Sequence, residues 1–255
     1  MQLDPIDQCR LELADEIQDG RELPFVIEAD RAVVAGAAAH HLERVLRAEP
    51  GQLYELSDGS SVRLAKIEST GRDRVEFRLL ESIPVRVSSL QTTLLLAVVK
   101  FDAFEWAIEK ATELGVARIV PLAAARSEKG LVAAAGKRAE RWKKIVFEAS
   151  QQSRRVALPT IEDLAQPAAA FARQGTAFGL MLSERPEARP LRQVLQDQAR
   201  DRVALAIGPE GGWTEAEFRA ASGSGFEEVS LGSLILRTET AVTASLAAVN
   251  YALEK

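Results

Sequence analysis

Apolar runs of strand length alternate with amphipathic stretches of helical length from residue 91 onward, and this alternation restricts the fold more than any other feature of the chain. The run TTLLLAVVK is almost continuously apolar, as in a parallel strand that is covered on both faces. FEWAIEKATEL follows with apolar residues at helical spacing, and Gly115 stands where that helix would end. VARIVPL, AFGLMLS and RVALAIG repeat the strand pattern. The alternation predicts an α/β domain with a mostly parallel sheet over residues 88–255.

The segment before residue 88 has a different pattern, with strand-like runs separated by turns. PFVIEA, LYELS, SVRLAKIES and DRVEFRLLESI carry the strand signal, and Asp58 with Gly59 marks a turn between two of them. One short helix, AAAHHLERVLR, interrupts the strands. We expect a small β-rich domain over residues 24–87, built as a barrel of five or six strands. Residues 84–89 form the natural linker to the second domain.

The charge of the chain is unevenly distributed. The net charge is −5, yet residues 1–30 contain nine acidic side chains and two arginines. Residues 1–23 form an acidic N-terminal extension, which is expected to be either a disordered or a lineage-specific arm. Residues 100–155 hold twelve Lys or Arg against seven Asp or Glu. This excess of positive charge fits either a nucleic-acid surface or a solvated helix face.

Other features exclude several classes of protein. No apolar run approaches the roughly 18 residues of a membrane span, and the N-terminus lacks the profile of a signal peptide, so we expect a cytoplasmic protein without a membrane partner. The single cysteine, Cys9, is expected to be an inert thiol. His40 and His41 diverge on a helix and have no third ligand at metal spacing, so no metal site is expected.

Chemistry is expected at the carboxyl ends of the parallel strands, where ligands of open α/β sheets bind. One such end is Leu182-Ser183 after AFGLMLS, and another is the glycine-rich stretch IGPEGGWTEAEF. Thr214 and Glu217 in that stretch have the spacing of a capping box, which predicts a helix start. The stretch lacks the glycine pattern of dinucleotide-binding and NTP-hydrolysing loops. It fits either a nucleotide-type pocket or a tight turn before a capped helix.

The third strand end is LGSLILRTETAV, residues 231–242. Leu234, Ile235 and Leu236 read as a short buried strand, directly followed by Arg237 and Glu239. Charged groups at the end of a buried strand are costly unless they are hydrogen-bonded or face a polar ligand. Either Thr238 or Thr240 is expected to cap the final helix.

The final helix carries two stripes of residues. Its apolar stripe is formed by Val242, Leu246, Val249 and Leu253. The adjacent stripe of small residues suits packing within the subunit or a dimer contact.

Several of these stretches, in this order, resemble the RsmE family of ribosomal RNA methyltransferases. The motifs are HHLERVLRAEPGQLYELSDG, EKATELGVARIVPL, EASQQSRRVALP, IGPEGG and LGSLILRTETA. The resemblance implies an N-terminal PUA-like RNA-binding barrel and a C-terminal SPOUT domain with a deep trefoil knot, over the residue ranges given above. It also implies S-adenosylmethionine as cofactor, a homodimer, and methylation of uridine N3 in 16S rRNA of the small ribosomal subunit.

The resemblance also implies site residues. Arg237 and Glu239 would be catalytic, as general base or as a cation that stabilises the deprotonated uracil. Lys100, Arg126 and Arg155 would contact the RNA. The residues expected at the cofactor are Leu182, Ile207, Gly208, Pro209, Glu210, Gly211, Gly212, Leu231, Gly232, Leu236, Arg237 and Ala241.

Two other functions remain open on the sequence. The same fold serves ribose 2′-O methyltransferases of tRNA or rRNA. A non-catalytic RNA-binding factor in ribosome assembly would share the two-domain organisation.

Overall fold

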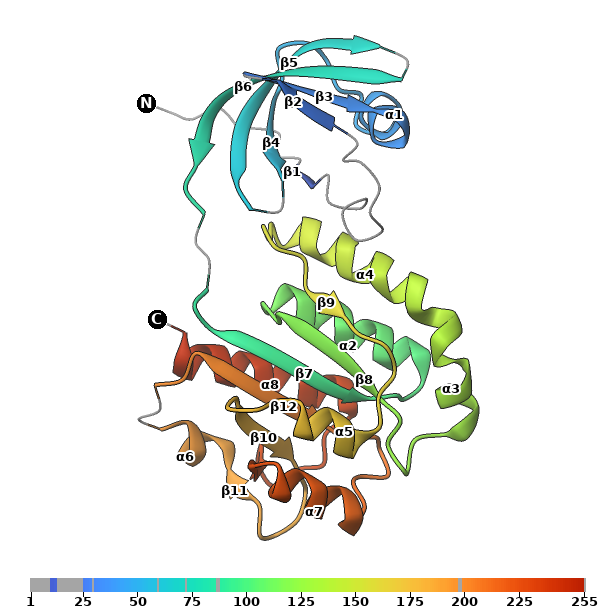
Figure 1. Cartoon of the computed structure of the whole chain (residues 1–255), viewed down its shortest axis with the longest axis vertical. Coiled ribbons are helices and arrows are strands. Elements are labelled where there is room, and N and C mark those ends of the chain that lie inside the picture. The colour runs from blue at the N-terminus through green and yellow to red at the C-terminus, as the bar shows by residue number, and fades with distance from the viewer. Residues whose placement is uncertain are drawn as a thin grey trace. The chain divides into compact units, whose positions relative to one another are not determined.

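The computed structural model describes residues 10–12, 25–28, 30–58, 60–71, 73–85, 88–196 and 199–254. The chain divides into two compact units (Figure 1). One comprises Met1–Val87 together with Arg154–Leu158, and the other comprises Ser88–Ser153 with Pro159–Lys255. Cys9, most of the acidic extension and part of the expected linker lie outside the described residues.

The N-terminal unit is built on a six-stranded sheet with the order β1-β4-β5-β6-β3-β2. All its pairings are antiparallel except the parallel pair β1 and β4. The strands are β1 (Arg10–Glu12), β2 (Phe25–Glu28), β3 (Arg31–Ala35), β4 (Leu53–Ser57), β5 (Val62–Gly71) and β6 (Arg74–Ile83), and helix α1 spans Gly36–Arg44. Alternate side chains, among them Ile67 and Phe77, fill the core of this unit. The predicted β-rich unit is therefore present.

The second unit contains a seven-stranded sheet with the order β11-β13-β10-β12-β7-β8-β9, in which every pairing is parallel. The strands are β7 (Gln91–Ala97), β8 (Arg118–Leu122), β9 (Thr160–Ile161), β10 (Phe178–Leu182), β11 (Arg189–Pro190), β12 (Arg202–Ile207) and β13 (Phe226–Ser230). The predicted α/β class with a mostly parallel sheet is confirmed.

Both faces of this sheet are covered, as the apolar run of β7 predicts. Leu94 and Leu96 belong to one core cluster, whereas Leu95 and Ala97 belong to another. The first cluster is shared with helices α2, α4, α6 and α8, and the second with α5 and α7 (Figure 1). The helices are α2 (Phe101–Glu113), α3 (Lys129–Ala134), α4 (Ala139–Gln152), α5 (Pro167–Ala172), α6 (Leu191–Leu195), α7 (Glu215–Gly223) and α8 (Thr238–Leu253), and a 3₁₀ turn spans Ala135–Arg138.

Helix α8 packs beside α2 through the stripe that the sequence predicts. Val242, Leu246 and Val249 are fully buried, and Leu253 is nearly so. Near its end, the Asn250 side chain donates a hydrogen bond of 2.7 Å to the carbonyl oxygen of Leu114, which follows α2. This bond satisfies a carbonyl group that the end of α2 would otherwise leave unpaired.

The prediction of a buried strand at Leu234, Ile235 and Leu236 is wrong. Residues 231–237 form an irregular loop, and Leu234 and Ile235 are each 79% exposed. The strand in this part of the chain is β13, which ends at Ser230. The apolar triplet follows the carboxyl edge of the sheet, where no strand of the described chain pairs with it.

Candidate active site

The strand order changes direction between β7 and β12. From β7 the chain continues through β8 and β9 on one side of the sheet, and then crosses to β10, β12 and β13 on the other. Ligands of doubly covered parallel sheets bind at the carboxyl ends of strands where the order changes direction in this way. Lys100 follows β7 at this edge, and the glycine-rich loop, residues 207–212, follows β12.

Tight contacts fix the glycine-rich loop. A Cβ atom on Gly208 would lie 3.0 Å from the indole of Trp213, and Gly212 has a φ of +69°. Both positions therefore favour glycine, the first for space and the second for its backbone conformation. The Trp213 indole N–H donates a hydrogen bond of 3.1 Å to the carbonyl oxygen of Leu182. This bond joins the loop after β12 to the end of β10.

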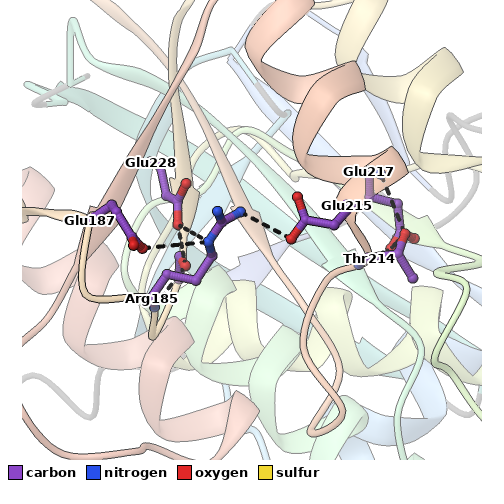
Figure 2. Close-up of polar contacts among 7 residues, drawn as sticks. Arg185, Glu187, Thr214, Glu215, Glu217 and Glu228 are labelled. Carbon is purple, nitrogen blue, oxygen red and sulfur yellow. Dashed lines mark hydrogen bonds and ion pairs between the residues drawn. The ribbon is translucent and has the colours of Figure 1, made fainter.

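Helix α7 begins with the predicted capping box. The Thr214 hydroxyl accepts a hydrogen bond from the Glu217 backbone N–H, and the Glu217 carboxylate accepts one from the Thr214 backbone N–H (Figure 2). The other carboxylate oxygen of Glu217 accepts a hydrogen bond of 2.8 Å from the backbone N–H of Ala125. The next residue, Arg126, donates a hydrogen bond of 2.8 Å to the Gly211 carbonyl oxygen. The loop after β8 is thus joined to α7 through Ala125 and to the glycine-rich loop through Arg126.

Arg185, in the loop after β10, is surrounded by carboxylates and was not among the residues expected from the sequence. Its guanidinium lies 3.5 Å from a carboxylate oxygen of Glu215 and 3.7 Å from those of Glu187 and Glu228 (Figure 2). It also lies over the Phe218 ring, 4.6 Å from the centroid. These contacts connect the loop after β10 to the first turns of α7. Glu215 and Glu228 come from α7 and β13, far from Arg185 in the sequence, so no local motif indicates the cluster.

The start of α8 closes the group of loops. The Thr238 hydroxyl donates a hydrogen bond of 3.2 Å to the Gly208 carbonyl oxygen. The predicted capping role of Thr238 or Thr240 is wrong, because Arg237 occupies the N-cap position and no side chain caps the helix. Thr238 instead binds the glycine-rich loop. The backbone N–H of Ala241 donates to the Arg237 carbonyl oxygen, which begins the helical hydrogen bonding.

Arg237 is exposed and Glu239 is partly exposed. Neither is therefore a costly charge at the end of a buried strand, which corrects the expectation from the sequence. Over the described residues, neither side chain forms an ion pair or a hydrogen bond within the chain. Both side chains are free to meet a ligand.

The structure connects many of the predicted site residues and leaves others apart. Trp213 bonds to Leu182 and lies against Gly208. Arg126 bonds to Gly211 in the same loop. Leu231 and Leu236 pack partly against the core beneath α8. Lys100 stands exposed at the N-cap of α2. Arg155 lies in Arg154–Leu158, which groups with the N-terminal unit, so its place in the site stays a prediction.

The described part of the chain contains no group of three His, Cys, Asp or Glu side chains arranged to hold a metal ion. None of the helices in that part combines the length and the apolar character needed to cross a membrane.

Comparisons with known proteins identify the family. Residues 86–250 match the family model described as an RNA methyltransferase domain. The ribosomal RNA small subunit methyltransferase E of Synechocystis is 34% identical over 90% of this chain and 75% of its own length. The Bacillus subtilis protein of the same name is 31% identical over 89% of this chain and 92% of its own.

A solved structure agrees with these relatives. The ribosomal RNA small subunit methyltransferase E of Neisseria gonorrhoeae, bound to S-adenosyl methionine, is similar with a TM-score of 0.81 and 30% identity. The similarity covers 91% of this chain and 96% of that one. The chain belongs to the ribosomal RNA small subunit methyltransferase E family.

Proposed function

We propose that this protein transfers a methyl group from S-adenosylmethionine to N3 of a uridine in 16S rRNA of the small ribosomal subunit. The observation that carries the proposal is that bonds join the ends of β8 and β10 to the loop after β12, and that this loop is joined through Gly208 to the start of α8. Family membership and the S-adenosyl methionine bound to the Neisseria gonorrhoeae relative support it.

The residues at these loops fit S-adenosylmethionine. The loops offer backbone groups and closely packed glycines, which let a ligand approach the main chain. Leu234 and Ile235 lie in the segment that leads to Thr238 and add exposed apolar surface, which suits the adenosine. The residues that would hold the cofactor are those expected from the sequence, from Leu182 through the glycine-rich loop to Leu236 and Ala241. When bound, this cofactor supplies a methyl group that is already activated for transfer.

The chain's own task is then to orient the uracil and help remove the N3 proton. Arg237 and Glu239 are the candidates, because both side chains lie beside the loops and have no partner within the described chain. A carboxylate at Glu239 would accept the proton. The guanidinium of Arg237 would stabilise the negative charge that develops on the uracil oxygens.

Basic side chains around the site are suited to the RNA backbone. Several basic residues of the region 100–155 are paired with acids, such as Arg138 and Arg141 with Glu105. Among the described residues, Lys100, Lys129 and Lys137 form no ion pair and are exposed. Together with Arg126 and Arg155, we expect them to bind phosphates or the target base.

The finer features of the fold belong to the same proposal. We assign residues 24–87 to a PUA-like RNA-binding barrel, residues 88–255 to a SPOUT domain with a trefoil knot, and residues 1–23 to an acidic extension. In the N-terminal unit Arg44 and Arg47 are exposed on either side of Val45, which is itself 64% exposed. Such a mixed basic and apolar surface suits RNA.

The homodimer is supported by the outer face of α8. Tyr251 is 93% exposed, and Ala247 is exposed one turn before it. A large aromatic side chain next to small ones is suited to close contact with the same helix of a second copy.

Nucleoside analysis tests the function. We expect 16S rRNA from cells that lack the protein to lack N3-methyluridine, and the gene to restore it. If the restored gene adds a ribose 2′-O-methyl nucleoside and no N3-methyluridine, the result would favour ribose 2′-O methylation. Calorimetry that detects no S-adenosylmethionine binding would favour an assembly factor.

A further inference from the structure

Glu217 makes a contact that its capping role does not require. A capping box needs the N3 carboxylate to accept one hydrogen bond from the N-cap backbone. Here Oε2 of Glu217 accepts from both the backbone N–H and the hydroxyl of Thr214, at 2.8 and 2.7 Å. Oε1 is directed elsewhere and accepts the N–H of Ala125 at 2.8 Å, from a residue 92 positions away in the chain.

The carboxylate is largely buried, with Glu217 only 8% exposed. A buried carboxylate is stable only when donors satisfy it, and hydrogen bonds to an ionised acceptor are stronger than neutral ones. Two of the three donors belong to Thr214 at the start of α7, so the Ala125 N–H is the one that connects α7 to the loop after β8.

Arg126 is the residue that this connection holds in place. It directly follows Ala125, and its guanidinium donates to the Gly211 carbonyl oxygen at 2.8 Å. Its Cβ lies 3.2 Å from the position that a Cβ on Gly211 would take, so the side chain lies against the glycine-rich loop. The guanidinium nevertheless belongs to an exposed residue and keeps further donors for a ligand.

We propose that Glu217 is a positioning residue for RNA binding, which fixes the backbone at Ala125 so that Arg126 presents its guanidinium to the RNA. The inference rests on the proposed function and deepens it. Glu217 touches neither RNA nor cofactor, and acts through Arg126.

Two variants of Glu217 separate this role from simple helix capping. Glu217→Gln replaces one acceptor oxygen by an NH₂ group, so the side chain cannot accept from both Thr214 and Ala125. Glu217→Asp keeps the charge but is one methylene shorter, so it cannot reach both partners either. The matched control is Thr214→Ala, which removes the capping hydroxyl and leaves the Ala125 bond intact.

The full-length protein is tested with 16S rRNA from cells that lack it, free and within isolated small subunits. We expect Glu217→Gln and Glu217→Asp to weaken RNA affinity by about tenfold, as loss of a charge-assisted bond implies. The affinity for S-adenosylmethionine should stay within about twofold of wild type. Thr214→Ala should leave the RNA affinity within about twofold of wild type. It should nevertheless lower the thermal midpoint about as much as the two Glu217 variants do, because it too disrupts the helix cap.

A double-mutant cycle with Arg126→Ala gives the decisive comparison. If Glu217 acts through Arg126, Glu217→Gln weakens RNA binding no further in the Arg126→Ala background. Amide hydrogen exchange at Ala125 should also accelerate in Glu217→Gln and not in Thr214→Ala. Additive effects on RNA affinity in the cycle would overturn the assignment of Glu217. So would a loss of RNA affinity in Thr214→Ala equal to that in Glu217→Gln. In both cases the proposed function survives if the wild-type protein is active. A wild-type protein that neither binds RNA nor transfers a methyl group would overturn both proposals.

Discussion

Thr238 and Gly208 are joined by a hydrogen bond of 3.2 Å between the threonine hydroxyl and the glycine carbonyl oxygen. Thr238 is 4% exposed and is the first residue of α8, while Gly208 directly follows β12. The bond therefore fastens the segment that carries Arg237 to the glycine-rich loop.

Thr238→Val tests this connection, because valine keeps the shape and lacks the donor. A buried hydrogen bond of this kind contributes about 1 kcal/mol to the free energy of unfolding. We expect a loss of that size and an increase of about fivefold in the dissociation constant for S-adenosylmethionine, measured by calorimetry. Thr240→Val is the control, since Thr240 is exposed. Equal effects of the two variants would contradict the role of the bond.

Arg237→Ala is expected to reduce methyl transfer without affecting folding. Removing one group that stabilises transition-state charge costs about 100-fold in kcat. The thermal midpoint should stay unchanged, because the side chain is exposed and unpaired in the described chain. Arg219→Ala, at a second arginine of the same unit, serves as the control. A soluble Arg237→Ala variant with wild-type kcat would refute the assignment.

Gly208→Ala is expected to disturb the cofactor loop. The added Cβ would lie 3.0 Å from the Trp213 indole, and that indole bonds to Leu182. We expect weaker binding of S-adenosylmethionine and destabilisation of about 1–3 kcal/mol, the usual range for overpacking. Gly223→Ala is the control, because nothing lies within 4 Å of the position that its Cβ would take and its φ is not in the left-handed region. If Gly208→Ala binds S-adenosylmethionine as tightly as wild type, cofactor binding does not depend on the close contact between the Gly208 backbone and the Trp213 indole.

Asp58 links the stability of the N-terminal unit to pH. Burial alone would raise its pKa, but hydrogen bonds from the backbone and hydroxyl groups of Ser61 and Ser60 outweigh it and lower the pKa to about 2. The folded pKa lies below the ordinary value of 3.8, so the stabilisation is present above about pH 4 and is lost as the pH falls towards 2. We expect Asp58→Asn to be less stable than wild type at pH 7, and the difference to shrink between pH 4 and 2 in thermal unfolding. A difference independent of pH would contradict the role of the carboxylate.

Patterns that depend on neighbouring residues predicted the structure well. The apolar run of β7 indicated a strand buried on both faces, and Leu94 and Leu95 do enter different clusters. Thr214 and Glu217 predicted the start of α7, because a capping box is encoded in four consecutive residues. Gly115, with a φ of +85°, lies beyond the end of α2 as expected.

Features set by distant contacts were not predicted. Strand β13 carries Glu227 and Glu228, which interrupt the apolar pattern and are paired with Arg189 and Arg185. Leu234 and Ile235 have the composition of a strand, yet they lie in a loop because no strand of the described chain pairs with them. The bond between Glu217 and Ala125 leaves no local trace, since its partners meet only in the folded chain.

Methyl transfer to purified RNA is the most direct test of the central claim. The protein is incubated with S-adenosylmethionine carrying an isotopic label in its methyl group and with 16S rRNA or small subunits from cells that lack the protein. Nucleosides are then separated and analysed by mass spectrometry. The proposed function predicts that the label appears in N3-methyluridine. A label in a ribose 2′-O-methyl nucleoside, or none at all, would contradict it.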